Sequence, residues 1–108
     1  MTTRISLLQR IKNLFGGSRS PEPAAVERRV FEITAELLNR DIRGLKLTDR
    51  YIEDLEIDDL DAVELVLGYE ESFGVSLPNE IAEKLETIGD AVNHLKEHAA
   101  VIRLVKLT

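Results

Sequence analysis

The chain of 108 residues is long enough for one small domain, and it contains only three Phe, two Tyr and no Trp, so the core must be aliphatic. It has no cysteine, which excludes a disulfide framework, thiolate metal sites and cysteine nucleophiles. The net charge of −6 is uneven, because residues 1–20 hold four basic residues and no acid, whereas residues 21–108 hold all 20 acids and ten basic residues. This acidic body disfavours nucleic-acid binding and favours a protein partner with a basic surface.

No apolar run approaches the ~20 residues that a membrane span needs. The N-terminus also lacks the uninterrupted apolar core of a secretory signal. We therefore expect a cytoplasmic protein.

Residues 4–15 are predicted to form a basic amphipathic helix. Its apolar residues share one helical face: Leu7, Leu8, Ile11, Leu14 and Phe15. Gly16 and Gly17 end it, and the stretch "GGSRSPEP" reads as a linker, so residues 1–22 are assigned to a separate helix and linker. Three interpretations remain open: packing on the domain or a partner, a helix on a membrane surface, or an organellar targeting peptide.

The domain proper is expected to cover residues 23–100 and to begin with a helix from about Pro23 to Leu38. Its buried stripe is predicted to be Val26, Val30, Ile33, Leu37 and Leu38. A long loop follows to residue 57, anchored by scattered apolar residues such as Leu45, Leu47, Ile52 and Leu55. A second helix is expected from Asp58–Asp59 to just before Gly74, because acidic residues suit a helix N-terminus.

Two more helices complete the prediction. Pro78 opens a short helix that runs through Lys84. Thr87 caps a last helix that runs to about His98, with Ile88, Ala91, Val92 and Leu95 facing inward. Residues 101–108, "VIRLVKLT", form an apolar C-terminal tail that fits either a strand or a frayed helix.

The segment around the second helix is more specific than this outline. Residues 53–95, "EDLEIDDLDAVELVLGYEESFGVSLPNEIAEKLETIGDAVNHL", contain the run E-D-L-x-x-D-x-L-D-x-V-E-L-V. With the first helix, the chain resembles the acyl carrier protein family over roughly residues 24–98. The matching residues include Glu53, Asp54, Leu55, Asp58, Leu60, Asp61, Val63, Glu64, Leu65, Val66, Glu70, Glu71, Phe73, Pro78 and Ile88. The resemblance implies an all-α four-helix bundle, with three long helices, one short helix and a long first loop, here preceded by the extra N-terminal helix.

The resemblance also implies an attachment residue, because the family binds phosphopantetheine through the serine of its D-S-L triplet. Asp59 stands at that position, and Glu56 stands where the family has a glycine. A carboxylate attacking phosphorus would give a labile mixed anhydride, whereas a stable arm needs an alcohol oxygen. Other serines, such as Ser72 and Ser76, lack the context of a helix start. We therefore expect no cofactor.

In that family the acidic side of the second helix meets basic patches on partner enzymes. The corresponding docking residues here would be Asp58, Asp59, Leu60, Asp61, Val63, Glu64 and Leu67. The charged members would steer encounter, and the three apolar residues would hold the complex. The alternative interpretation is that these acids are merely solvated and favour the helix N-terminus.

No metal site or catalytic residue is expected. The acids lack the order of a calcium loop and its glycine. His94 and His98 have the i, i+4 spacing of zinc ligands, but no third ligand is evident, so exposed histidines near a helix end are the expected account. No nucleophile stands beside a base and no glycine-rich phosphate loop is present, so we expect no enzyme.

The sequence therefore predicts a non-catalytic, monomeric, carrier-like domain that lacks its attachment serine and acts through protein docking. The alternatives are a genuine acyl carrier protein of fatty-acid or polyketide biosynthesis with a replaced serine, or a domain that binds an apolar ligand without a covalent arm. A membrane-surface contact through residues 4–15 also stays open.

Overall fold

The computed structural model describes residues 25–107, with side chains for residues 25–98. The predicted N-terminal helix of residues 4–15 lies outside this range. Helix α2 spans Val26–Leu38. Four of its five predicted stripe residues, Val26, Val30, Ile33 and Leu37, are buried, and Leu38 is partly buried against them. The helix ends at Asn39, whose backbone is left-handed (φ 53°), a conformation that Asn adopts more readily than most residues.

Helix α3 spans Asp59–Phe73, which confirms the predicted second helix. It ends at Gly74, which has a left-handed backbone (φ 64°) and donates its N–H to the carbonyl of Glu70. Helix α4 spans Asn79–Ala82 and is shorter than predicted. The N–H groups of Lys84 and Leu85 bond to carbonyls only three residues back, so a turn replaces the last part of the expected helix.

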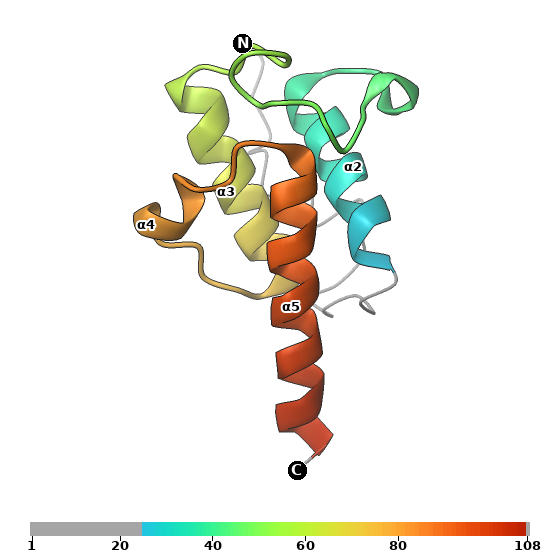
Figure 1. Cartoon of the computed structure of the whole chain (residues 1–108), viewed down its shortest axis with the longest axis vertical. Coiled ribbons are helices and arrows are strands. Elements are labelled where there is room, and N and C mark those ends of the chain that lie inside the picture. The colour runs from blue at the N-terminus through green and yellow to red at the C-terminus, as the bar shows by residue number, and fades with distance from the viewer. Residues whose placement is uncertain (1–24, 108) are drawn as a thin grey trace, which may run out of the picture.

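Helix α5 spans Ile88–Leu107. Ile88, Ala91, Val92 and Leu95 are buried, as predicted. The predicted end near His98 is wrong, because the helix continues to Leu107, beyond the ends of α2 and α3 (Figure 1). Residues 99–107 contain no glycine or proline to stop it, so the strand interpretation of the last segment is wrong as well.

The long loop between α2 and α3 contains a short 3₁₀ helix, η2 (Ile42–Gly44), which was not predicted. Asp41 caps it by accepting a hydrogen bond from the N–H of Arg43. Leu55 is buried, as expected, but Leu47 and Ile52 are 39% and 69% exposed and do not anchor the loop. Tyr51, which is buried, takes that role.

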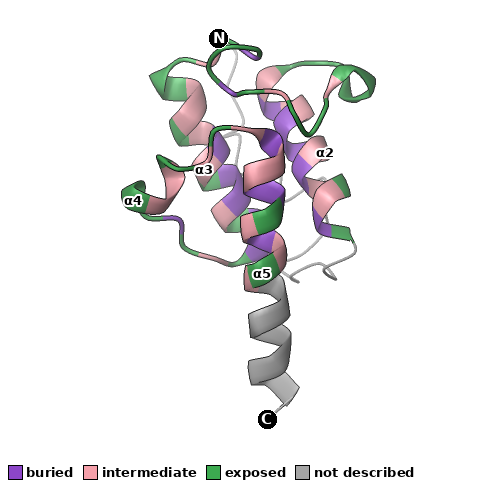
Figure 2. Cartoon of the chain, in the orientation of Figure 1, coloured by how far each residue is buried: buried purple, intermediate pink, exposed green. Residues whose placement is uncertain are grey.

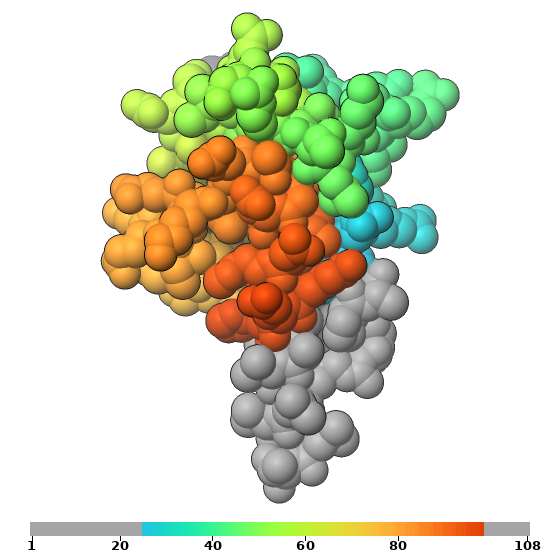
Figure 3. All heavy atoms as spheres, viewed as in Figure 1, coloured from blue at the N-terminus to red at the C-terminus, as the bar shows by residue number. Residues whose placement is uncertain are grey.

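Backbone hydrogen bonds tie this loop to the start of α5. The N–H of Tyr51 donates to the carbonyl of Glu86 (2.9 Å), and the N–H of Gly89 donates to that of Leu47 (2.8 Å). An isolated antiparallel bridge pairs Arg50 with Thr87. In the space-filling view the loop lies directly against the beginning of α5 (Figure 3).

The described helices form one bundle in which α2 packs against both α3 and α5. Their buried residues face one another around a mainly aliphatic core that also includes Tyr51, Tyr69 and Phe73 (Figure 2). No strand occurs between residues 25 and 107, which confirms the all-α fold with three long helices and one short helix.

Candidate functional site

The start of α3 is built by two reciprocal carboxylate hydrogen bonds. Asp58 is the N-cap, and its Oδ1 accepts the N–H of Asp61 at 2.8 Å. Asp61 returns the bond, since its Oδ2 accepts the N–H of Asp58 at 3.1 Å. This capping box satisfies two backbone donors that a helix start leaves unpaired. Asp58 and Asp61, two of the predicted docking residues, therefore stabilise the start of α3 through these hydrogen bonds and are also accessible to solvent.

Three apolar side chains of α3 point outward. Leu60, Val63 and Leu67 are 63%, 55% and 42% exposed, and their spacing of three and four residues puts them on one face. We call these three residues the apolar stripe. Asp59 is exposed and Glu64 is half-buried on the same helix, while the opposite side of α3 enters the core. The structure thus brings the seven predicted docking residues together on the first two-thirds of α3.

Beside the stripe lies an open groove of about 390 Å³ between α3 and α4, which the sequence did not reveal. Its lining is mainly apolar: Ala62, Val63, Val66, Leu67, Glu70, Leu77, Asn79 and Ala82. Glu70 holds the far end of the groove in place, because its Oε2 accepts the N–H of Leu77 at 2.7 Å. Leu77, an apolar residue in the connection between α3 and α4, is buried beside this groove.

Behind the groove the core holds a chain of hydroxyl groups that sequence reasoning missed. Thr34 Oγ1 donates to the carbonyl of Val30 (2.7 Å) and lies 2.6 Å from the hydroxyl of Tyr69, which lies 2.9 Å from that of Tyr51. A carbonyl oxygen only accepts, so the hydroxyl proton of Thr34 is used in the bond to Val30. Thr34 must therefore accept its second hydrogen bond from Tyr69. Tyr69 must in turn accept from Tyr51, which fixes the direction of the whole chain.

These tyrosines are hard to ionise. Burial raises the pKa of Tyr69 to about 12. Burial and the neighbouring Tyr69 raise the pKa of Tyr51 well above its usual value of 10. Near them remains a cavity of only about 60 Å³. Ligand pockets usually measure ~300 Å³ or more. This cavity beside the two tyrosines is smaller than that range.

The acids that precede α3 are arranged differently from those on it. Arg50 binds the carboxylate of Asp54 through its side-chain Nε (3.1 Å) and also contacts Glu53 (3.6 Å). The hydrogen bonds from Arg50 lower the pKa of Asp54 below its usual range. Glu56 has a left-handed backbone with φ 54°, the conformation that favours glycine. Glu53 and Asp54 thus form a local turn and are not part of the α3 face.

The histidines differ from expectation. The prediction of exposed histidines near a helix end is wrong, because α5 continues nine residues beyond His98 to Leu107. His94 is half-buried, with its Nε2 enclosed, and its ring lies 6.0 Å from that of His98. Within the part of the chain that the structure describes, no three His, Asp or Glu side chains are grouped to hold a metal ion.

A capped acidic helix in a four-helix bundle is the arrangement expected for the family that the sequence resembles. Residues 28–95 match the family described as the phosphopantetheine attachment site. The acyl carrier proteins of Rickettsia canadensis, Rickettsia typhi and Rickettsia prowazekii are each 39% identical to this chain over 72 residues, which cover 67% of it and 84% of theirs. The chain therefore belongs to the acyl carrier protein family, whose members are carriers rather than catalysts and interact with partner enzymes.

The family description implies a phosphopantetheine arm, which needs an exposed hydroxyl at the start of α3. Residues 56–64 contain no Ser, Thr or Tyr, and Asp59 offers a carboxylate. Thr34, Tyr51, Tyr69 and Ser72 carry hydroxyls but are buried. Ser76 is exposed, but it lies in the turn after α3 rather than at a helix start. The residues present at this position therefore do not fit the arm.

Within residues 25–107, no helix combines the length and the apolar character needed to cross a membrane.

Proposed function

We propose that this chain is a carrier-type domain without a prosthetic arm, which docks through α3 on an enzyme that recognises acyl carrier proteins. It would act as a regulator, a decoy or a structural subunit, and it would perform no catalysis. The observation that supports this is the exposed apolar stripe of Leu60, Val63 and Leu67, flanked by carboxylates. Exposed apolar residues with carboxylates on the same helix suit a partner with a basic rim and an apolar centre.

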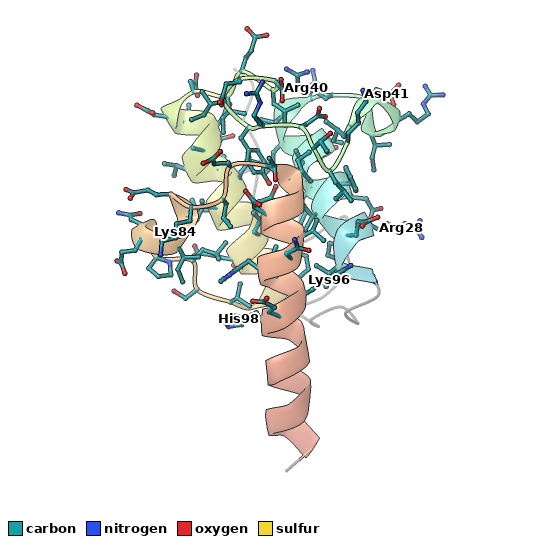
Figure 4. All side chains as sticks on the ribbon, in the orientation of Figure 1. Arg28, Arg40, Asp41, Lys84, Lys96 and His98 are labelled. Carbon is teal, nitrogen blue, oxygen red and sulfur yellow. The ribbon has the colours of Figure 1, made fainter. Side chains whose placement is uncertain are left out.

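The charge around the stripe strengthens this proposal. Residues 51–83 contain eleven acids and no Lys or Arg. They are Glu53, Asp54, Glu56, Asp58, Asp59, Asp61, Glu64, Glu70, Glu71, Glu80 and Glu83. The cations Arg28 and Lys96 lie on α2 and α5, and Lys84 follows α4 (Figure 4). The charged residues of the segment 51–83 are thus all acidic, which favours encounter with a basic partner.

The absence of the arm is tested first by the intact mass of the protein isolated from its own source. We expect the mass of the unmodified chain. A mass increased by one phosphopantetheine would move the attachment to another residue and would restore a carrier function.

Docking is tested by competition for a phosphopantetheinyl transferase, an enzyme that recognises carrier proteins. The substrate is the variant Asp59→Ser with Glu56→Gly, loaded from coenzyme A, and the unaltered chain is the competitor. We expect the unaltered chain to inhibit loading and the double variant Asp61→Lys, Glu64→Lys to inhibit at least about tenfold less. Each lost charge contact contributes up to ~1 kcal/mol, and repulsion adds to the loss.

The matched control reverses two acids on the other two long helices, Glu27→Lys on α2 and Glu97→Lys on α5. It changes the net charge equally, so it should inhibit nearly as well as the unaltered chain. Equal weakening by both pairs would show that only net charge matters, and it would reject the docking face.

A second function is a genuine acyl carrier protein whose serine has been replaced. The retained capping box at Asp58 and Asp61 favours it, because the helix start that presents the attachment residue is intact. Efficient loading of Asp59→Ser by the transferase supports this function, and failure to load, in a variant that is folded by circular dichroism, counts against it. An apolar ligand held without a covalent arm is disfavoured by the small core cavity.

A further inference from the structure

The α3–α4 groove has a candidate occupant within this chain. The groove is open, mainly apolar and about 390 Å³ in volume. Val63 and Leu67 belong both to its lining and to the exposed stripe, so groove and stripe form one continuous apolar surface. Surfaces of this kind usually mark an interaction site.

The chemistry of the occupant follows from the surrounding charge. The segment from residue 51 to residue 83, which contains both α3 and α4, has eleven acids and no basic residue. A matching ligand is an amphipathic helix with one apolar face and basic residues on the other. Such a helix in an acidic, apolar groove gains both apolar burial and electrostatic attraction.

Residues 4–15 have this composition. They carry the predicted apolar face of Leu7, Leu8, Ile11, Leu14 and Phe15. Their charged residues are Arg4, Arg10 and Lys12, with no acid. The two segments of opposite charge thus stand in one sequence, and each combines apolar residues with charge of one sign.

We infer that residues 4–15 bind the α3–α4 groove of their own chain and compete with the external partner. This inference rests on the proposed function, because the covered surface includes the docking residues Val63 and Leu67. The tail would act as an internal inhibitor that a stronger partner displaces.

The connection is long enough. Residues 16–24 separate the tail from Ala25, the N-cap of α2, and nine extended residues reach roughly 30 Å. Helix α2 begins at the end of the bundle where α3 finishes, because the two helices run in opposite directions (Figure 1). The chain therefore enters α2 at the end of the bundle where α3 finishes, on the side opposite α4 (Figure 1). A connection of this length gives an effective concentration of order mM, so even a tail affinity of ~1 mM would fill the groove about half of the time.

The test uses the full chain and a nitroxide spin label. The sequence has no cysteine, so Asn13→Cys provides a single labelling position on the polar face of the tail. Paramagnetic broadening is then measured by NMR for every backbone amide. We expect the amides of Val63, Leu67 and Ala82 to lose more than half of their intensity, and those of Asn93 and Glu97 on α5 to keep most of theirs.

Two variants sharpen the result. Ile11→Asp with Leu14→Asp alters only the tail, and Val63→Asp with Leu67→Asp alters exposed residues of the groove. Each should restore the lost intensities without changing the fold, and raised salt should restore them in part. Broadening centred on Phe31 and Ile42, which line the separate groove between α2 and η2, would overturn the inference. So would uniform broadening or none.

A second sample mixes spin-labelled chain without isotope enrichment with isotope-enriched chain without a spin label. It distinguishes a tail that binds its own chain from a tail that binds a second copy. The inference requires no broadening in this mixture, whereas broadening there would mean that the tail binds a second copy. The spin-label result needs no partner enzyme, so it can fail while the competition assay succeeds. If both succeed, the variant Ile11→Asp with Leu14→Asp should inhibit the transferase several-fold better than the unaltered chain, because its groove is free.

Discussion

Glu56 is the residue where local backbone conformation and side-chain type disagree most. Its φ of 54° lies in the left-handed region, where a side chain costs roughly 1–2 kcal/mol relative to the right-handed form. Glu56→Gly should therefore raise the free energy of unfolding by about 1 kcal/mol, as measured by urea denaturation. Asn39→Gly is the control, because Asn39 has φ 53° but tolerates it better, so its gain should be smaller. An unchanged or lower stability of Glu56→Gly would mean that the carboxylate makes a stabilising contact.

The hydroxyl chain gives a second prediction at the residue scale. Tyr69→Phe removes the middle member, so the buried hydroxyl of Tyr51 loses its acceptor, at a cost of about 1–3 kcal/mol. Tyr51→Phe removes only the first donor and leaves every remaining hydroxyl proton with an acceptor. It should therefore lower the free energy of unfolding by less than Tyr69→Phe does. Equal losses measured by urea denaturation would contradict the direction assigned to the chain.

The same tyrosines predict the response to alkali. Both have a folded-state pKa above the usual value of 10, so the folded protein favours the neutral phenols. Their contribution to stability is complete below about pH 10 and is lost as pH rises through 10 towards 12. These are the only two tyrosines in the sequence, so tyrosinate absorbance follows the hydroxyl chain directly. Titration of either group at its usual pKa in the folded protein would contradict the burial.

At the scale of single elements, the capping box at the start of α3 can be separated from the charge of the helix. Asp58→Ala removes the acceptor for the N–H of Asp61 and should cost about 1 kcal/mol in thermal or urea unfolding. Asp59→Ala, one residue on, removes only a favourable charge near the helix N-terminus, for which a few tenths of a kcal/mol are expected. If Asp58→Ala and Asp59→Ala lower the free energy of unfolding equally, the contribution of Asp58 comes from its charge and not from its capping hydrogen bond.

The sequence was sufficient for elements whose signals are local. The bounds of α3 follow from the acidic cap and Gly74, and the buried faces of α2 and α5 follow from their 3.6-residue periodicity. The end of α5 was missed because residues 99–107 are apolar and partly β-branched, a composition that fits strand and helix alike. The end of α4 was missed because a turn of 3₁₀ type differs from an α-helix by one residue of hydrogen-bond spacing.

For the candidate site, the sequence predicted which α3 residues share a face but not what lies beside them. The groove depends on how α4 and Leu77 are placed against α3, and the hydroxyl chain joins Thr34 to Tyr69 across 35 residues. Such contacts depend on tertiary packing, which leaves no periodic pattern. The exposure of Ile52 was missed for the same reason, since an apolar residue in a loop has no periodicity to indicate its side.

At the scale of the whole molecule, the contact between the long loop and α5 is close enough to test with one methyl group. A Cβ added at Gly89 would lie 3.0 Å from the carbonyl oxygen of Leu47, an atom of the backbone that cannot easily move aside. Gly89→Ala should therefore lower the unfolding free energy by about 1 kcal/mol, despite the better helix propensity of alanine. Gly44→Ala is the control, because nothing lies within 4 Å of the added carbon, and it should be neutral or slightly stabilising.

The same contact sets an order of events when the chain folds. The loop bonds at Leu47, Asp49 and Tyr51 find their partners at residues 86–89, so the loop cannot reach its final form before that later part of the chain has docked. In synthesis from the N-terminus, α2 and α3 emerge first and can associate while the connection between them is still unfixed. The presentation of Asp58 and Asp59 at the top of α3 is then completed only after the ribosome has released the beginning of α5.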